Sequence, residues 1–164
     1  GFSTHLHGFE AASGLVEVIC RGGAEIYLAP VEEGVTLAAV LASGLPIWTV
    51  LHFDHPREVS PETRHAASLL LEAGIPLLNQ SVLLAGVNDS VPTLRALSER
   101  LFAAGVLPYY LHLLDRVQGA AHFDVPETRA LELLAGITAT LPGYLVPKLV
   151  REVAGAPSKV AVGG

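Results

Sequence analysis

A lysine near the end of the chain is the first residue whose chemistry could matter. Lys159 follows residues 155–158, a short loop of small residues that comes after the last apolar segment. The amine of a lysine can form a Schiff base with a carbonyl cofactor. Most lysines are solvated surface charges, and the residues alone favour that simpler interpretation for Lys159.

Two neighbouring amides interrupt an apolar run. Asn79 and Gln80 lie inside residues 76–84, where an unpaired buried amide would cost about 1–3 kcal/mol. Both therefore need hydrogen-bond partners, which are either backbone groups of a loop or a ligand, and the residues do not choose between these two. Asp115, at the end of the apolar run 109–115, is suited equally to binding a ligand and to capping a loop.

His52 and His55, on either side of Asp54, could be taken for a pair of metal ligands. A spacing of three places two side chains on opposite faces of a strand, and Pro56 already turns the chain, so we do not expect a metal site here. Cys20 is the single cysteine, and an iron–sulfur cluster needs three or four thiolates. We interpret Cys20 as a small buried residue.

Helical and extended segments alternate along the chain and would position these residues. Caps, apolar spacing and terminating glycines predict helices at 34–42, at 61–73, from the caps 88–90 to Gly105, and at 126–141. Apolar runs predict strands at 47–53, 76–84, 107–113 and 143–149, and the tail 155–164 reads as an exposed loop or a frayed end. This alternation indicates an α/β fold with a parallel sheet, in which ligands bind beyond the carboxyl ends of the strands.

Size and charge narrow the class of protein. A chain of 164 residues with 51 % hydrophobic content is expected to form one globular unit. The net charge of −6, without a run of like charges, argues against direct binding of nucleic acid. Apolar runs shorter than about 20 residues argue against a membrane span, and with no signal peptide evident we expect a cytoplasmic protein. Because the chain begins with Gly1 and contains no methionine, we expect a fragment of a longer protein.

Four strings identify a family when they are taken together. They are FDHPRE at 53–58, NQSVLLAGVND at 79–89, PYYLH at 108–112 and GYLVP at 143–147. In order and spacing they resemble the lysine 2,3-aminomutase family of radical S-adenosylmethionine enzymes, over about residues 35 to 160. Within that family, 112–123 and 147–159 look most like the enzyme that isomerises a lysine residue of elongation factor P.

The resemblance implies a fold, a mechanism and a set of site residues. The fold would be the C-terminal part of a partial (β/α) radical S-adenosylmethionine barrel, with 1–34 poorly matched, 35–150 in the barrel and 151–164 a loop carrying the cofactor lysine. In the mechanism a reduced [4Fe-4S] cluster cleaves S-adenosylmethionine, and pyridoxal phosphate carries the migrating amino group. The matching positions are Lys159 as the catalytic Schiff-base lysine, Gln80, His112, His52 and Asn79 near the cofactors, and Asp115 and Glu152 on the distant ammonium of the substrate lysine.

Departures from the family pattern leave alternatives open. Glu152 stands where the enzymes acting on free lysine have aspartate, and His112 stands where they have tyrosine. The substrate is therefore either elongation factor P or free lysine. The family's CxxxCxxC motif lies before the matched region, so we expect this chain alone to be inactive. A non-catalytic remnant or assembly domain is the remaining alternative.

Overall fold

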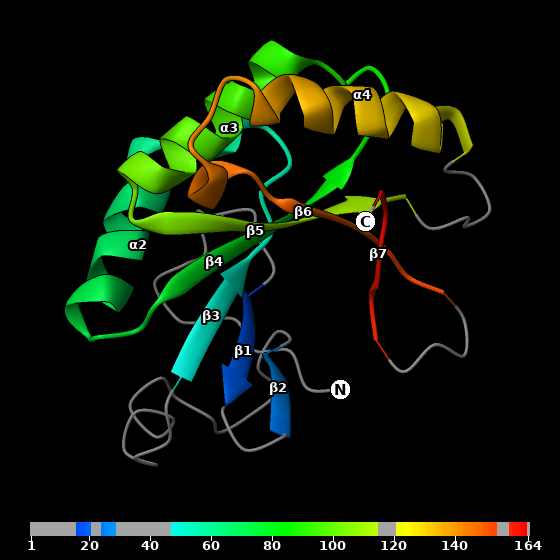
Figure 1. The fold of residues 1–164 in the computed structure, drawn as a ribbon. Helices are drawn as coiled ribbons and strands as arrows, with labels where there is room; N and C mark the ends of the chain where they lie inside the picture. The colour runs from blue at the N-terminus through cyan, green and yellow to red at the C-terminus, as the bar shows by residue number, and fades with distance from the viewer. Residues whose placement is uncertain (1–15, 21–23, 29–46, 115–120, 154–157, 164) are drawn as a thin grey trace.

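The parallel strands expected from the sequence form the centre of one sheet. The computed structural model describes residues 16–20, 24–28, 47–114, 121–153 and 158–163 (Figure 1). Within these residues the sheet has seven strands in the order β2-β1-β3-β4-β5-β6-β7. The four central strands are mutually parallel: β3 (Ile47–Leu51), β4 (Leu77–Leu83), β5 (Val106–Leu113) and β6 (Lys148–Arg151). Three more strands join antiparallel at the two edges: β1 (Val16–Cys20), β2 (Ala24–Leu28) and β7 (Val160–Ala161).

The helices between the parallel strands gather on one face of the sheet (Figure 1). They are α2 (Pro61–Glu72), α3 (Val91–Ala103) and α4 (Glu127–Thr138), with the 3-10 turns η1 (Pro56–Glu58), η2 (Ala121–Phe123) and η3 (Gly143–Leu145) in the connections. None of the described helices has the length and apolar character needed to cross a bilayer. The predicted helix at 34–42, like most of the poorly matched segment 1–34, lies outside the described residues.

Local signals explain where α2 and α3 begin and end. The Ser60 hydroxyl accepts a hydrogen bond from the Thr63 N–H at 3.2 Å, and Ser90 does the same for Thr93 at 3.3 Å. Each serine satisfies an amide that the first helical turn leaves unpaired. Gly105 follows α3 with φ +76°, a left-handed conformation that favours glycine. The capping and glycine signals in the sequence therefore predicted these boundaries correctly.

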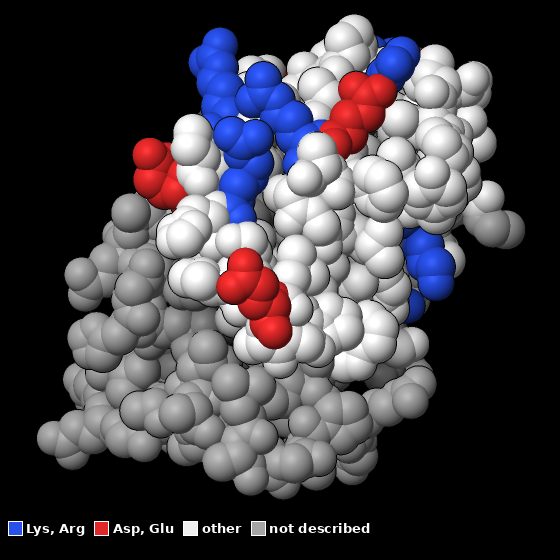
Figure 2. Space-filling model, turned by 90° about the vertical axis from the view of Figure 1, so that its left-hand side faces the viewer, with Lys and Arg blue, Asp and Glu red and all other residues white. Residues whose placement is uncertain are grey.

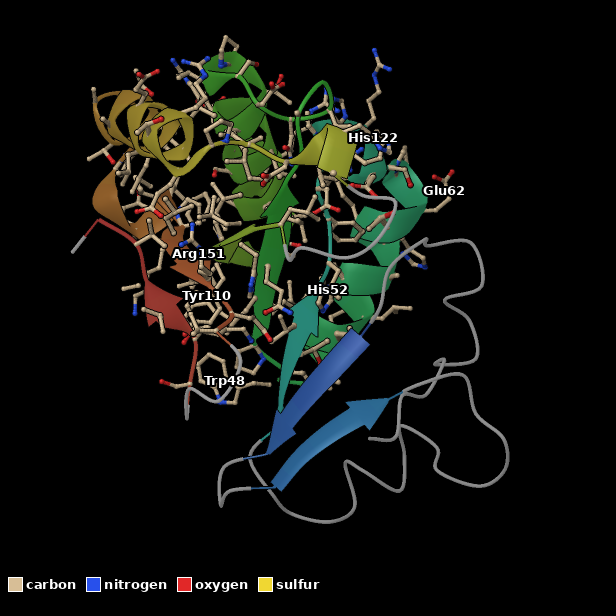
Figure 3. The ribbon with its side chains drawn as sticks, turned by 90° about the vertical axis from the view of Figure 1, so that its right-hand side faces the viewer. Trp48, His52, Glu62, Tyr110, His122 and Arg151 are labelled. Carbon is tan, nitrogen blue, oxygen red and sulfur yellow. The ribbon has the colours of Figure 1, made fainter. Side chains whose placement is uncertain are left out.

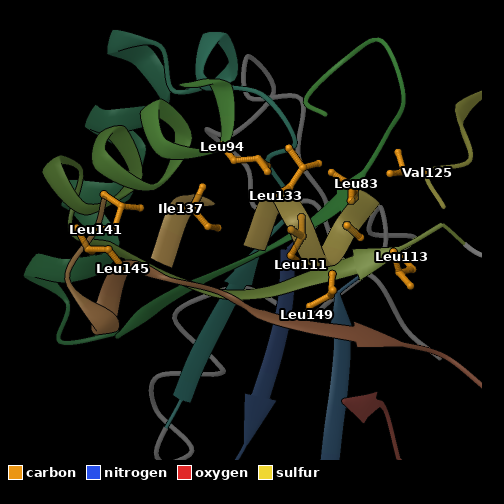
Figure 4. Packing of buried hydrophobic residues seen from close by; sticks show 11 residues of the cluster. Leu83, Leu94, Leu111, Leu113, Val125, Leu133, Ile137, Leu141, Leu145 and Leu149 are labelled. Atoms are coloured by element: carbon orange, nitrogen blue, oxygen red, sulfur yellow. The ribbon is translucent and has the colours of Figure 1, made fainter. Parts of the chain in front are cut away.

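Apolar side chains between the sheet and the helices form two buried clusters. One lies between the helices α2 and α3 and the sheet, where it includes the end of β3 and the starts of β4 and β5. Leu70, Leu77 and Leu101 belong to it. The other lies under α4 (Figure 4) and includes Leu133 and Ile137, which have no exposed surface. Burying each such side chain contributes about 1.5–3 kcal/mol.

The surface contributes far less to stability than this core. The face turned toward the reader in Figure 2 carries both basic and acidic side chains. Arg95 and Glu99, four residues apart on α3, form an exposed ion pair of 2.8 Å. Pairs of this kind contribute roughly 0–1 kcal/mol.

Two predictions about the end of the chain were wrong. Residues 143–149 do not form a strand: Gly143–Leu145 is the 3-10 turn η3, and β6 begins only at Lys148. Pro147 has no N–H to donate to a sheet, which explains why the strand starts after it. The tail is not simply a frayed end, because Val160 and Ala161 pair with β6 as β7, and the Val162 N–H donates to the Leu149 carbonyl at 3.0 Å.

Candidate active site

Strand register gathers polar side chains on the face of the sheet that the helices leave uncovered. Gln80 is level with Tyr110, and Tyr110 is level with Lys148, so the three share a face. His112 lies one step further along that face of β5. Residues of the other parity, such as Leu77 and Leu83, belong to the core under the helices. We call this face the site face and define it by His52, Gln80, Tyr110, His112, Glu152 and Lys159. Figure 3 labels two of these residues, His52 and Tyr110.

His52 and Gln80 are in direct contact on the site face. The His52 Nε2 lies 3.2 Å from the Gln80 Nε2. Burial, and then the nearby charges of His112 and Lys159, lower the pKa of His52 below its ordinary 6.5. The ring is therefore neutral at pH 7, and because an amide nitrogen only donates, it accepts from Gln80 at this atom.

Lys159, the residue before the edge strand β7, reaches the same face. Antiparallel pairing of Arg151 with Val160 brings Glu152 and Lys159 opposite each other, one step further along. The Lys159 Nζ lies 3.8 Å from the Glu152 Oε1 and 5.5 Å from the centre of the Tyr110 ring. Its side chain is 29 % exposed, so the amine is partly withdrawn from water but still accessible.

Aromatic contacts connect Lys159 to His112. The rings of Tyr110 and His112 meet edge to face, with centroids 5.7 Å apart and planes at 75°. A side-chain hydrogen bond to Tyr109, and then burial, raise the pKa of Tyr110 to about 12. The Tyr110 hydroxyl is therefore protonated at neutral pH and offers Lys159 a neutral ring face.

Asn79 points into the core side of the sheet and holds the loop that follows β3. Its Oδ1 accepts from the Phe53 N–H at 2.9 Å, and its Nδ2 donates to the Phe53 carbonyl and to the Ser81 hydroxyl. These contacts account for the burial of Asn79 without a ligand, so the loop-backbone alternative describes it. Gln80, one residue later, faces the other way and is the amide available to the site face.

Asp54 and Asn88 tie the same loop to the end of β4. The Asp54 Oδ1 accepts from the Val82 N–H at 2.6 Å. Asn88 donates to the carbonyls of Asp54 and Val82, both at 2.8 Å, and accepts from the Leu84 N–H at 2.7 Å. Burial raises the pKa of Asp54, and the bond from Val82 opposes that shift. Much of two recognisable strings, 53–58 and 79–89, thus serves to fix the backbone that carries His52 and Gln80.

The other predicted positions have separate outcomes. His55, which was not predicted as a site residue, caps η1, since its Nδ1 accepts from the Arg57 N–H at 3.1 Å. Asp115 lies outside the described residues. Tyr110 was missed as a site residue, although its spacing of two from His112 in a predicted strand already placed both on one face.

Comparison with known proteins identifies the family. No family model matches the chain. It is 52 % identical over 117 residues to L-lysine 2,3-aminomutase of Escherichia coli, which is 71 % of this chain and 34 % of that protein. It is 38 % identical over 147 residues to L-lysine 2,3-aminomutase of Fusobacterium nucleatum, which is 90 % of this chain and 35 % of that protein. The chain belongs to the lysine 2,3-aminomutase family.

This result confirms the family that the four strings indicated. The relative from Haemophilus influenzae, also named L-lysine 2,3-aminomutase, is 50 % identical over 110 residues. The chain spans only about a third of the length of these aminomutases, 32–35 % of each.

Proposed function

We propose that this chain forms part of an aminomutase that moves the amino group of a lysine between C2 and C3, with pyridoxal phosphate held by Lys159. The observation that carries the proposal is the position of the Lys159 amine, 5.5 Å from the Tyr110 ring and 3.8 Å from Glu152. That position is on the same face as the contacting pair His52 and Gln80. The names of the relatives support the reaction, and the geometry supports the lysine.

The residues present are compatible with an aldehyde cofactor. Lys159 supplies a partly buried amine, and Gln80 with neutral His52 supplies hydrogen-bonding groups beside it that carry no charge of their own. Lys159 would hold the cofactor, and Gln80, His52 and His112 would orient the bound group on the site face. When bound, pyridoxal phosphate supplies a conjugated ring that delocalises charge or an unpaired electron from the amino carbon.

The two acidic positions account for substrate recognition in this proposal. The Glu152 carboxylate is on the site face and 56 % exposed, so it can take the distant ammonium of a lysine substrate. Asp115 is proposed as the second carboxylate, on the strength of the resemblance. Pairing of these carboxylates with the ammonium at the far end of the substrate would select a substrate with the chain length of lysine.

The substrate we propose is a lysine attached to elongation factor P through its carboxyl group, because migration between C2 and C3 requires a free 2-amino group and a lysine within the main chain has none. The support is the resemblance of 112–123 and 147–159, including His112, to the enzyme of that specificity. Free lysine is the second candidate, because the curated relatives are named L-lysine 2,3-aminomutase. Competition of free lysine against elongation factor P, with a full-length protein that contains this chain, distinguishes them: preferential conversion of free lysine would refute our choice.

The radical chemistry needs groups that these 164 residues do not supply by themselves. A [4Fe-4S] cluster that cleaves S-adenosylmethionine requires three thiolates, and the chain has one cysteine, Cys20. We therefore propose that this chain alone does not form β-lysine. Turnover of lysine or of elongation factor P by the isolated chain would contradict this.

Fixing the cofactor chemically tests the role of Lys159. The purified chain is mixed with pyridoxal phosphate and reduced with borohydride, and the modified residue is mapped by mass spectrometry. Lys148 and Lys159 are the only lysines, so the result is a choice between two sites and the N-terminus. We expect the label on Lys159, its loss in Lys159→Ala, and its retention in the matched control Lys148→Ala. Equal labelling of both lysines, or none, would refute the cofactor role of Lys159 in this chain and favour a non-catalytic remnant.

A further inference from the structure

The two adjacent tyrosines of β5 are arranged by an irregularity in the sheet. The register between β4 and β5 shifts there: Asn79 pairs with Pro108, but Gln80 pairs with Tyr110, which leaves Tyr109 as an extra residue. Successive side chains of a regular strand point to opposite faces, whereas a bulge re-aims them. The ring centroids of Tyr109 and Tyr110 consequently lie only 4.0 Å apart.

Both lysines of the chain lie over this tyrosine pair. The Lys148 Nζ is 5.6 Å from the centre of the Tyr109 ring, and the Lys159 Nζ is 5.5 Å from that of Tyr110. Both distances are within the roughly 6 Å over which a ring face attracts a cation. The bulge therefore places two neighbouring aromatic rings at the site face, and each ring contacts one lysine amine.

Lys159 depends on such a contact more than Lys148 does. It precedes β7, a strand of two residues at the edge of the sheet. Its side chain is a flexible four-carbon stem, so the backbone pairing of β7 with β6 does not by itself fix the position of the amine. The contact with Glu152 is long for an ion pair, at 3.8 Å, and both groups are partly exposed, so it holds the amine weakly.

We propose that Tyr110 is a positioning residue, whose aromatic ring holds the Lys159 amine over the site face. This role rests on the proposed function of Lys159 as the cofactor lysine. The ring is itself fixed on two sides, by Tyr109 and by the edge-to-face contact with His112. The ring face is what matters to the amine, so phenylalanine should replace tyrosine here and leucine should not.

Ring-current shifts test the contact independently of any cofactor. Reductive methylation of the chain with ¹³C-formaldehyde labels Lys148, Lys159 and the N-terminal amine and keeps their positive charge, and samples of Lys148→Arg and Lys159→Arg assign the two lysine signals. We expect the Lys159 methyl signal to be displaced from that of free dimethyl-lysine in the parent chain and in Tyr110→Phe, and to move toward it in Tyr110→Leu. Tyr144→Leu, which removes an exposed tyrosine from η3, is the matched control and should change neither signal. An unmoved Lys159 signal in a folded Tyr110→Leu chain would overturn the proposal.

The borohydride experiment then tests the consequence for cofactor binding. We expect the ratio of label on Lys159 to label on Lys148 to fall roughly two- to fivefold in Tyr110→Leu, the range that an exposed cation–ring contact allows, and to recover in Tyr110→Phe. If the parent chain labels Lys159 and Tyr110→Leu does so equally, the positioning role is wrong and the proposed function stands. If the parent chain does not label Lys159, the proposed function fails, and the ring-current result alone decides whether Tyr110 holds the amine. The Lys148 amine lies over the Tyr109 ring, so its methyl signal should also be displaced. If that displacement persists in Tyr110→Leu, the variant has kept the local fold.

Discussion

Asn88 is a buried position at which a side chain of nearly equal size should strongly destabilise the fold. Its side chain has no exposed surface and makes three hydrogen bonds to backbone groups, donating to the carbonyls of Asp54 and Val82 and accepting from Leu84. Asn88→Asp keeps the size of the side chain and the acceptor for Leu84. It replaces both donated bonds by a carboxylate oxygen that faces two carbonyl oxygens.

The expected loss follows from the two hydrogen bonds that Asn88 donates. Each lost bond removes about 0.5–1.5 kcal/mol, and leaving buried groups unpaired adds about 1–3 kcal/mol. We therefore expect Asn88→Asp to lower the free energy of unfolding by about 2–6 kcal/mol, a large part of the 5–15 kcal/mol typical of a domain. Because the fold disfavours the charged form at this position, protonation should reduce the loss as the pH falls.

Urea denaturation followed by fluorescence measures this directly, since Trp48 in β3 is the only tryptophan. The matched control is the neighbouring Asp89→Asn, whose Oδ1 accepts from the exposed Gly86 N–H at 3.0 Å and keeps an acceptor oxygen after the change. We expect the control to stay within about 0.5 kcal/mol of the parent chain. Similar losses for the two variants would refute the argument that the paired backbone groups at Asn88 brace the loop.

Two further predictions follow from burial and from backbone conformation. The lowered pKa of His52 means that the folded chain binds fewer protons there than the unfolded chain, so the stability it contributes is present above pH 6.5 and is lost as the pH falls. Relative to His52→Gln, the parent chain should lose stability in urea denaturation as the pH falls below about 6.5, and parallel curves would contradict this. Gly105→Ala should destabilise by roughly the 1–2 kcal/mol of a left-handed residue, because its Cβ would meet only the end of the exposed Leu71 side chain, which can move aside. Gly74→Ala, with a similar φ of +79° and no neighbour within 4 Å, should show a similar loss in thermal unfolding, and a much larger loss at Gly105 would contradict this.

The sequence was informative where a local signal carried the structure. Ser60 and Ser90 predicted two helix starts, and Gly105 predicted a helix end, because capping and left-handed turns involve only neighbouring residues. It failed at 143–149, where an extended composition that follows Pro142 and contains Pro147 forms a turn before a late strand. The pairing of β7 with β6 was also missed, since two residues cannot signal a strand when their partner lies outside their own segment.

For the candidate site, the sequence indicated which residues belong to it, and the tertiary structure determined how they are placed. The identity of Lys159, Glu152, His52, Gln80 and His112 came from residue types in a recognisable order, which the chain carries without being folded. Only the tertiary structure decided that Asn79 belongs to the loop and Gln80 to the site face, because that choice depends on which side of the sheet the helices cover. The contact of Tyr110 with Lys159 likewise depends on register across three strands and on a bulge, and such long-range pairing leaves no mark in any one segment.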